Sequence, residues 1–216
     1  MVSQTEQEMI LSRMLDKALR RSNAVDTESL CIIAGAKCWS LRADVHVLDH
    51  DGGLVDASCI SVLGALRHFR LPDVSVDGND VTIYPPAERE PVPLSLMRHT
   101  LCVTFSYYYY HHHHSQQDGG GGGGSGQLIS LIDANLAEEQ ARDGDMTIAI
   151  TEHGELCQMT KPGGLAVDAY ALLDCTTIAL AKVKQLSAII NSSLERDIAR
   201  RNPAGVVKEL TAENDR

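Results

Sequence analysis

Residues 44–69, with the sequence DVHVLDHDGGLVDASCISVLGALRHF, contain the pattern on which the fold prediction depends. The first part alternates between polar and apolar side chains, as a strand with one buried face does. The turn Asp49-His50-Asp51-Gly52-Gly53 follows, and its glycines permit backbone angles that other residues avoid. Residues 54–69 are almost entirely apolar, which predicts a helix that is buried on more than one side. A strand, a glycine turn and a helix start in this order often build a phosphate site.

The same stretch carries five side chains of the types that bind metals: Asp44, His46, Asp49, His50 and Asp51. On a strand, Asp44 and His46 share one face, but His50 lies too far along the chain to form a compact site with His46. The residues after Asp51 also lack the spacing and the glutamate of an EF-hand loop. We therefore interpret these residues as a solvated strand face and a turn, and predict neither a metal site nor a cofactor.

Composition limits the classes of function. The 216 residues have a formal net charge of −10, and only 4% of them are aromatic. A protein that grips nucleic acid alone usually shows a basic patch and aromatic side chains that stack on bases. If the protein acts on RNA, basic partner subunits are expected to make many of the contacts that bind it. No segment approaches 18 uninterrupted apolar residues, which predicts no membrane span.

Six cysteines are scattered without CxxC spacing, and most lie within apolar runs: Cys31, Cys38, Cys59, Cys102, Cys157 and Cys175. We interpret them as reduced, buried small hydrophobic residues of a cytosolic or nuclear protein, in preference to a disulfide framework.

Hydrophobic periodicity organises the rest of the chain. It predicts a helix over residues 3–21, a hairpin of two strands within residues 29–50, and a second hairpin about Asp77-Gly78-Asn79-Asp80. The proline-rich segment 85–93 is the candidate domain boundary. Residues 107–126 have low complexity and are predicted to form a flexible surface loop.

The second half repeats this order of elements. A short helix is predicted near residues 135–144, then a hairpin about Glu152-His153-Gly154-Glu155, and then a long helix that begins at Asp168. Hairpins that are each followed by a helix predict an α+β fold with two similar layers of sheet and helix.

Three further motifs invite a functional reading. The flexible run His111–His114 offers no fixed geometry for a metal, and Lys161-Pro162-Gly163-Gly164 lacks the frame of a phosphate loop and predicts a tight turn. Asp143-Gly144-Asp145 could hold a metal or supply a general acid, although a turn with a helix-ending glycine fits the periodicity better.

Four stretches carry a resemblance to a known family: DTESLCIIAGAKCWSL (26–41), the DHDGG corner (49–53), EREPVPLS (88–95) and EEQARDGDMTIAITEHGELCQMTKPGG (138–164). From about residue 6 to about residue 196, the chain resembles the eukaryotic exosome ring subunits of the PM/Scl autoantigen type, which are RNase PH-like. The resemblance implies the RNase PH fold without its N-terminal part. Residues 1–87 would be a partial first subdomain of the ribosomal protein S-five-like kind. Residues 88–200 would be the C-terminal subdomain, interrupted by the loop 107–126, and residues 201–216 a flexible tail.

Active members of the family use phosphate to attack the 3′ end of RNA, and they carry Gly-Gly-Thr-Arg at this corner. The matching residues here are Gly52, Gly53, Leu54 and Val55, and Val55 offers phosphate neither charge nor a bidentate fork. Asp145 falls where active relatives place a catalytic carboxylate, and it is interpreted as a vestige. The resemblance thus implies no catalytic residue, with Gly52, Gly53 and Val55 as remnants of the phosphate corner.

The resemblance implies a noncatalytic structural subunit of the exosome core, acting in rRNA maturation and mRNA decay in the nucleus, nucleolus and cytoplasm. Its expected partners are other RNase PH-like ring subunits, cap subunits, and RNA through the assembled ring; no membrane is expected. Two alternatives stay open. One is a phosphate-dependent 3′–5′ exoribonuclease that uses Asp145, and the other is a truncated paralogue outside the complex.

Overall fold

The computed structural model describes residues 6–110 and 127–201, so the predictions about His111–His114 and about the tail from residue 202 lie outside the described residues. The helices are α1 (Glu6–Leu15), which continues as the π-helical turn η1 (Asp16–Arg20), α2 (Leu54–His68), α3 (Leu136–Ala141) and α4 (Ala169–Arg201). The strands are β1 (Cys31–Ile33), β2 (Lys37–Cys38), β3 (Arg70–Leu71), β4 (Val74–Asp77), β5 (Asp80–Ile83), β6 (Val92–Pro93), β7 (Thr100–Tyr110), β8 (Gln127–Ile132), β9 (Gly144–Thr151) and β10 (Leu156–Thr160).

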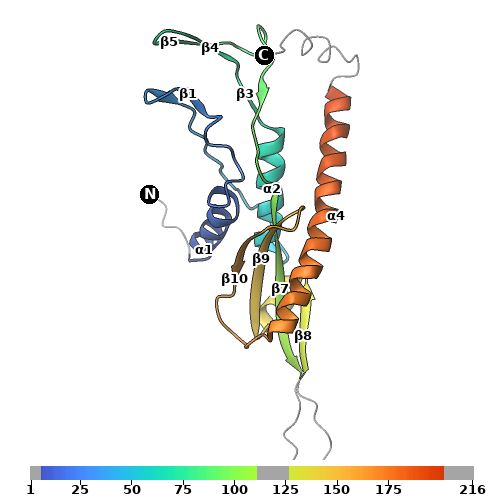
Figure 1. The fold of residues 1–216 in the computed structure, drawn as a ribbon. Coiled ribbons are helices and arrows are strands. Elements are labelled where there is room, and N and C mark those ends of the chain that lie inside the picture. The colour runs from blue at the N-terminus through green and yellow to red at the C-terminus, as the bar shows by residue number, and fades with distance from the viewer. Residues whose placement is uncertain (1–5, 111–126, 202–216) are drawn as a thin grey trace, which may run out of the picture.

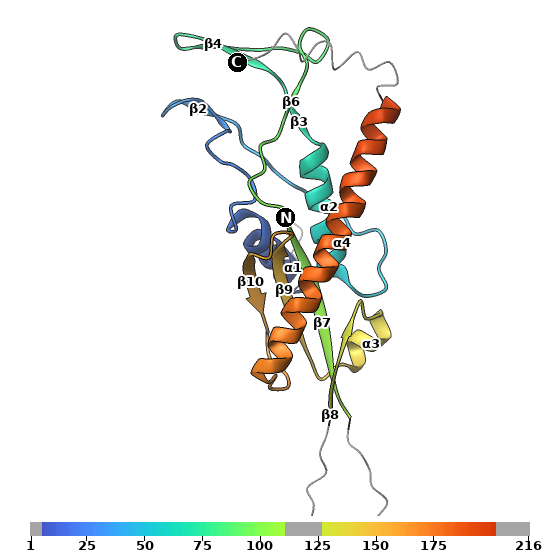
Figure 2. The ribbon, with the colours of Figure 1, turned by 45° about the vertical axis from the view of Figure 1, so that its right-hand side comes forward.

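An antiparallel sheet in the order β10-β9-β7-β8 forms the centre of the fold. Its longest strand, β7, pairs with β9 from Thr100 opposite Thr151 to Tyr107 opposite Gly144. Helix α4 covers one face of the sheet, and α1 and α2 lie on the other side (Figures 1 and 2). Alternate residues of β7 therefore enter two different clusters, Val103 and Phe105 on the side of α4 and Cys102 on the side of α1. These layers confirm the predicted α+β class.

Helix α2 confirms the prediction for residues 54–69, and it ends one residue earlier. Leu63 belongs to the cluster with α4, while Cys59 and Val62 belong to the cluster with α1, so the helix is buried by two neighbours. A narrow stripe that includes Ala57 and Ser61 stays exposed. Small and hydroxyl-bearing side chains make that exposure inexpensive, since little apolar area meets water.

The predicted hairpin within residues 29–50 is wrong in its second half. The ribbon is short, with β1 paired to β2 about Gly35, and residues 39–53 contain no strand. Val45 and Val47, which were expected to face a core, are 38% and 46% exposed. Alternation alone does not make a strand when no neighbouring strand pairs with its N–H and C=O groups. The second hairpin is confirmed, because β4 pairs with β5 from Val74 opposite Ile83 to Asp77 opposite Asp80.

The start of the predicted surface loop 107–126 is also wrong. Tyr107 to Tyr110 are the last residues of β7 and pair with β8. Tyr107 is 1% exposed, and its hydroxyl lies 3.4 Å from the sulfur of Cys175 on α4. Four tyrosines look like a low-complexity tract, but tyrosine is a strong strand former and Tyr107 continues the inward alternation of Val103 and Phe105.

The cysteine interpretation holds for part of the set. Cys59, Cys102 and Cys175 are buried, and Cys157 is partly buried, as expected of small hydrophobic residues. Cys31 and Cys38 are exposed, because they lie on the β1–β2 ribbon, which projects away from the central sheet (Figure 1). The expectation that all six are buried is therefore wrong for this pair.

The short elements of the second half lie near their predicted positions, but α3 ends at Ala141, and Gly144, which was expected to end that helix, is the first residue of β9. Helix α3 begins after Asn135, β9 and β10 form a hairpin, and α4 begins directly after Asp168. Among the described residues, no helix is both long enough and apolar enough to cross a membrane.

Candidate functional site at the glycine corner

Two glycines shape the corner that leads into α2. Gly52 has φ +88° and Gly53 has φ +60°, both in the left-handed region that favours glycine. A Cβ on Gly52 would lie 2.2 Å from the carbonyl oxygen of Ala134, so the loop before α3 packs directly on the corner. At Gly53 the nearest atom to such a Cβ is an Asp133 side-chain oxygen at 3.5 Å. The corner therefore needs a glycine at Gly52 for both space and conformation, and at Gly53 for conformation alone.

The backbone amide that precedes α2 already has an anionic partner. The Gly53 N–H donates to Oε1 of Glu139 at 2.9 Å. Helix α3 presents that carboxylate, and a capping box fixes its start: the Asn135 side chain accepts from the amide of Glu138, whose side chain accepts from the Asn135 amide. A carboxylate of the chain itself thus stands where an anion would bind at the start of a helix.

A partly buried carboxylate lies in the first turn of α2. Asp56 accepts hydrogen bonds from the amide of Thr104 at 2.7 Å and from its hydroxyl at 2.8 Å, and that hydroxyl lies 3.0 Å from the hydroxyl of Thr147. Burial raises the pKa of Asp56 to about 6, with smaller contributions from the charges of Asp133 and Glu139, while the Thr104 hydrogen bonds act in the opposite direction. The corner is therefore an acidic environment that disfavours a further negative charge.

Val55, the second residue of α2, lies in an apolar contact. It packs against the apolar cluster shared by α1, η1, α2 and the sheet. This position makes Val55 part of that cluster, with no cation offered to the corner. Val55 thus contributes to packing at the position where the resemblance implies a phosphate-binding side chain in active relatives.

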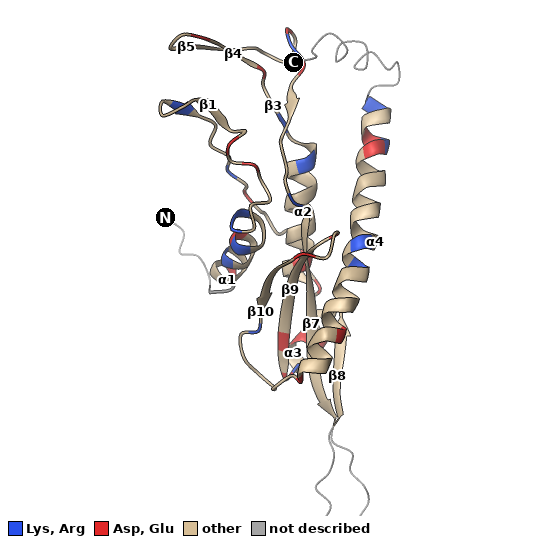
Figure 3. Cartoon of the chain, in the orientation of Figure 1, with Lys and Arg blue, Asp and Glu red and all other residues tan. Residues whose placement is uncertain are grey.

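Asp145 joins the corner through an arginine. It lies on β9, and its Oδ1 is 3.5 Å from Nη2 of Arg142; Nη1 of the same guanidinium is 3.8 Å from Oε1 of Glu139. The neighbouring Asp143 turns the other way and accepts from the amide of Tyr109 at 2.8 Å. Figure 3 shows acidic residues, in red, on the backbone of α3 and at the start of β9. The structure therefore brings Asp145 and the glycine corner into one site, and it separates the two acids of the Asp-Gly-Asp motif.

Sequence reasoning missed the residues that define this site: Asp56, Thr104, Glu139 and Arg142. Only one signal in the sequence pointed to it, the Asn-x-x-Glu spacing of the capping box at residues 135–138. That signal predicts where α3 begins, and it says nothing of what Glu139 contacts.

The other residues with a candidate role lie elsewhere. Asp44 pairs with Arg42 at 2.8 Å, whose hydrogen bond lowers the pKa of Asp44. Over the described ranges 6–110 and 127–201, no group of three or more His, Cys, Asp or Glu side chains could hold a metal ion. Where a turn was predicted at Lys161–Gly164, the backbone bends at Gly163 and Gly164, and a Cβ on Gly164 would lie 2.4 Å from the Asp143 carbonyl oxygen.

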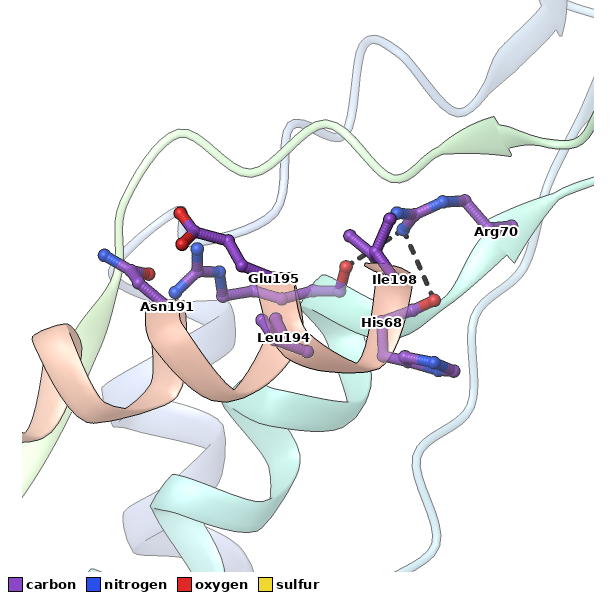
Figure 4. A pocket seen from close by; sticks show the side chains of 7 residues that line it. His68, Arg70, Asn191, Leu194, Glu195 and Ile198 are labelled. Atoms are coloured by element: carbon purple, nitrogen blue, oxygen red, sulfur yellow. Dashed lines mark hydrogen bonds between the residues drawn. The ribbon is translucent and has the colours of Figure 1, made fainter. Parts of the chain in front are cut away.

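A separate cavity of about 340 Å³ lies between the C-terminal ends of α2 and α4. Figure 4 shows the side chains that line it: Arg67, His68, Arg70, Asn191, Leu194, Glu195 and Ile198. Nη1 of Arg70 donates to the carbonyls of Arg67 and His68, at 3.0 and 3.3 Å, and so stabilises the end of α2. This cavity shares no residue with the glycine corner.

Two sequence profiles identify the class to which this fold belongs. Residues 2–72 match domain 1 of the 3′ exoribonuclease family, and residues 124–182 match domain 2 of that family. A chain of the Archaeoglobus fulgidus exosome, solved with RNA bound to the active site, has the same fold: the TM-score is 0.62 at 24% identity, over 85% of this chain and 61% of that one. The fold is thus that of RNase PH, as the resemblance implied.

Curated relatives narrow the class. The exosome complex component rrp45 of Schizosaccharomyces pombe is 42% identical over 197 residues, which are 91% of this chain and 62% of that protein. RRP45 of Saccharomyces cerevisiae is 42% identical over 211 residues, which are 98% of this chain and 67% of that protein. The chain belongs to the RNase PH family of 3′ exoribonuclease folds, and within it the chain is similar to exosome component RRP45. It spans about two thirds of the length of these fungal relatives.

Proposed function

We propose that this chain is a noncatalytic structural subunit of an exosome core ring that supports 3′–5′ RNA processing and degradation, including rRNA maturation and mRNA decay. The observation that carries the proposal is the hydrogen bond from the Gly53 amide to the Glu139 carboxylate at 2.9 Å. A phosphorolytic site needs an amide and a cation free for phosphate at this place. Here the amide donates to an internal acid, and Val55 packs against the apolar cluster shared by α1, α2 and the sheet.

The acidic surroundings support the same proposal. A dianionic phosphate at the corner would lie beside Glu139 and Asp56, and like charges repel most strongly where water is excluded. Asp145 is paired with Arg142, which also faces Glu139. In this proposal Asp145 has no catalytic role, and Gly52, Gly53 and Val55 are remnants of a phosphate corner.

The proposed partners follow from the relatives, which are named exosome complex components. They are other RNase PH-like ring subunits and cap subunits, with RNA held by the assembled ring and locations in the nucleus, nucleolus and cytoplasm. A net charge of −10 supports a chain that depends on basic partners for RNA. We also retain residues 1–87 and 88–200 as the proposed parts of the first and second subdomains.

The catalytic part is tested by incubating the purified chain with end-labelled RNA, inorganic phosphate and Mg²⁺. The expected result is no release of nucleoside diphosphates, under conditions in which an active RNase PH-like exosome releases them. Release that is lost in Asp145→Asn and kept in Asp143→Asn would contradict the proposal, because Asp143 bonds to Tyr109 and lies outside the Arg142 pair.

Assembly is tested separately by affinity purification of the chain from its own cells at native expression. Other RNase PH-like ring subunits are expected in the eluate in comparable amounts. Recovery of the chain without them would favour a paralogue that lies outside the complex.

A further inference from the structure

Two exposed cysteines face each other across the β1–β2 ribbon. Cys31 on β1 is the register partner of Cys38 on β2, and both are exposed free thiols. The ribbon turns at Gly35, where φ is +72°, and the amide of Ala36 donates to the carbonyl of Ile33 at 3.0 Å. Figure 1 shows the ribbon at the periphery of the molecule, away from the central sheet. The two thiols are therefore open to small reagents.

The hydrogen bonds of the ribbon define what kind of pair this is. The amide of Trp39 donates to the carbonyl of Leu30 at 2.8 Å, so the bond joins the residue after Cys38 to the residue before Cys31. That pattern identifies Cys31 and Cys38 as a non-hydrogen-bonded pair of an antiparallel ladder. In such a pair the Cα atoms are about 4.5 Å apart and the side chains lie on the same face, closer than in a hydrogen-bonded pair. A disulfide spans Cα separations of about 4.4–6.8 Å, so it fits here without a large movement of the backbone.

We propose that Cys31 and Cys38 form a dithiol site that small disulfides of the glutathione class oxidise to an intramolecular disulfide, and that free thiols reduce again. One cysteine thiolate attacks a sulfur of the small disulfide, forms a mixed disulfide and releases one small thiolate. The second cysteine thiolate attacks the cysteine sulfur of that mixed disulfide, forms the Cys31–Cys38 bond and releases the other small thiolate. Two electrons pass to the small disulfide, and the two protons from the cysteines end on the two released thiols.

The other cysteines provide an internal contrast. Cys59 and Cys102 also lie side by side, on α2 and β7, but they are 0% and 2% exposed. A hydrogen bond with Cys59, together with burial, raises the pKa of the Cys102 thiol, which suppresses the reactive thiolate. Cys157 is partly buried and lies 3.5 Å from the hydroxyl of Thr100. Two pairs of cysteines therefore lie close together, but only the pair Cys31 and Cys38 is exposed enough to react with a small disulfide.

The test exposes the folded, fully reduced chain to mixtures of oxidised and reduced glutathione, and then blocks free thiols with an alkylating reagent. Trypsin cleaves after Arg21, Lys37 and Arg42, which places the two cysteines on separate peptides, residues 22–37 and 38–42. A disulfide between them is detected by mass spectrometry as one linked pair that separates on reduction. Phenylarsine oxide, which bridges two neighbouring thiols, serves as a second probe.

The expected product is the linked peptide pair, at least about tenfold more abundant than glutathione adducts on Cys31 or Cys38, because the neighbouring thiol has a high effective concentration. Cys38→Ser should leave Cys31 with a glutathione adduct only. It should also abolish the protection of Cys31 from alkylation that phenylarsine oxide gives in the wild-type chain. The control Cys157→Ser should change neither result. Glutathione adducts at both positions in the wild-type chain without the linked pair would overturn the proposal. So would a folded chain in which the linkage joins Cys59 to Cys102, or joins two molecules.

Discussion

The amide of Gly53 donates to the carboxylate of Glu139, a residue 86 positions further along the chain, at 2.9 Å. This single bond connects the corner before α2 to the short helix α3. It also places a negative charge of the chain where the start of a helix attracts anions. In the proposed function, the corner keeps the glycine turn and helix start of a phosphate site, and the Glu139 carboxylate occupies the place of the anion.

The two corner glycines differ in how they tolerate a side chain. Gly52→Ala should lower the free energy of unfolding by about 3 kcal/mol or more, because it adds a clash at 2.2 Å from the Ala134 carbonyl to the cost of a left-handed backbone. Gly53→Ala, with its nearest contact at 3.5 Å, should cost only about 1 kcal/mol. Urea unfolding of both variants measures the difference, and equal losses would show that α3 does not pack on the corner as described.

Asp56 should make the stability of the chain depend on pH. Its pKa is about 6 in the folded chain and near the ordinary value of 3.8 in the unfolded chain, so folding strengthens proton binding. The stabilisation from protonated Asp56 is fully present below about pH 4 and is lost as the pH rises through 6, on the order of 3 kcal/mol in all. Asp56→Asn, which cannot ionise and keeps partners for Thr104, should remove this loss. Unfolding free energies at pH 4.5 and pH 7.5 provide the measurement; the same pH slope in both chains would refute the assignment.

Restoring one cation should not restore phosphate binding. Val55→Arg would add a charge, but Glu139 would still hold the Gly53 amide, and loss of packing against the apolar cluster should cost about 1–3 kcal/mol. Calorimetric titration with inorganic phosphate should show no binding at millimolar concentrations, as for the wild-type chain. The double variant Val55→Arg, Glu139→Gln is the informative comparison, since it also removes the competing charge. Tight binding by the single variant would show that Glu139 does not block the corner.

The four tyrosines at the end of β7 should differ sharply in their contribution to stability. Tyr107→Ala should lower the free energy of unfolding by about 3–5 kcal/mol, because it empties a fully buried site between the sheet and α4. Tyr110→Ala, at a position that is 54% exposed, should cost less than about 1 kcal/mol. Chemical unfolding of the two variants measures this difference. A small loss in Tyr107→Ala would show that these tyrosines lie in a loop and not at the end of β7.

Local sequence patterns were sufficient to predict most helices and strands and to recognise the resemblance to a family. Each of these patterns is contained in a short stretch of sequence, so periodicity can find it: the alternation through Val103 and Phe105, and the apolar run of α2. The glycines of the corner, and the valine at position 55 where the resemblance implies an arginine, could likewise be identified from the local sequence. Such features depend on neighbours in the chain.

The remaining features depend on partners that are distant in the sequence. Val45 and Val47 alternate as a strand does, yet they have no strand to pair with in the described chain. The contact of Glu139 with Gly53 and the burial of Asp56 against Thr104 join segments that no local pattern connects. Composition also misled at Cys31 and Cys38, because apolar neighbours do not bury a residue on a projecting ribbon.

Helix α4 is packed less closely toward the end of its 33 residues than in its first half. Its buried positions are Cys175, Ala179, Val183 and Ser187, and the last of these donates to the Glu152 carboxylate on the β9–β10 hairpin. Beyond Ser187 no residue of this helix, which the structure describes to Arg201, is buried. The contacts of this part are partial: Ile190 packs against the core cluster, and Asp197 lies 3.1 Å from the ring of His68 at the end of α2. Its amide hydrogens should therefore exchange faster with solvent deuterium than those of the first half, and their exchange should slow when another surface covers the end of α4.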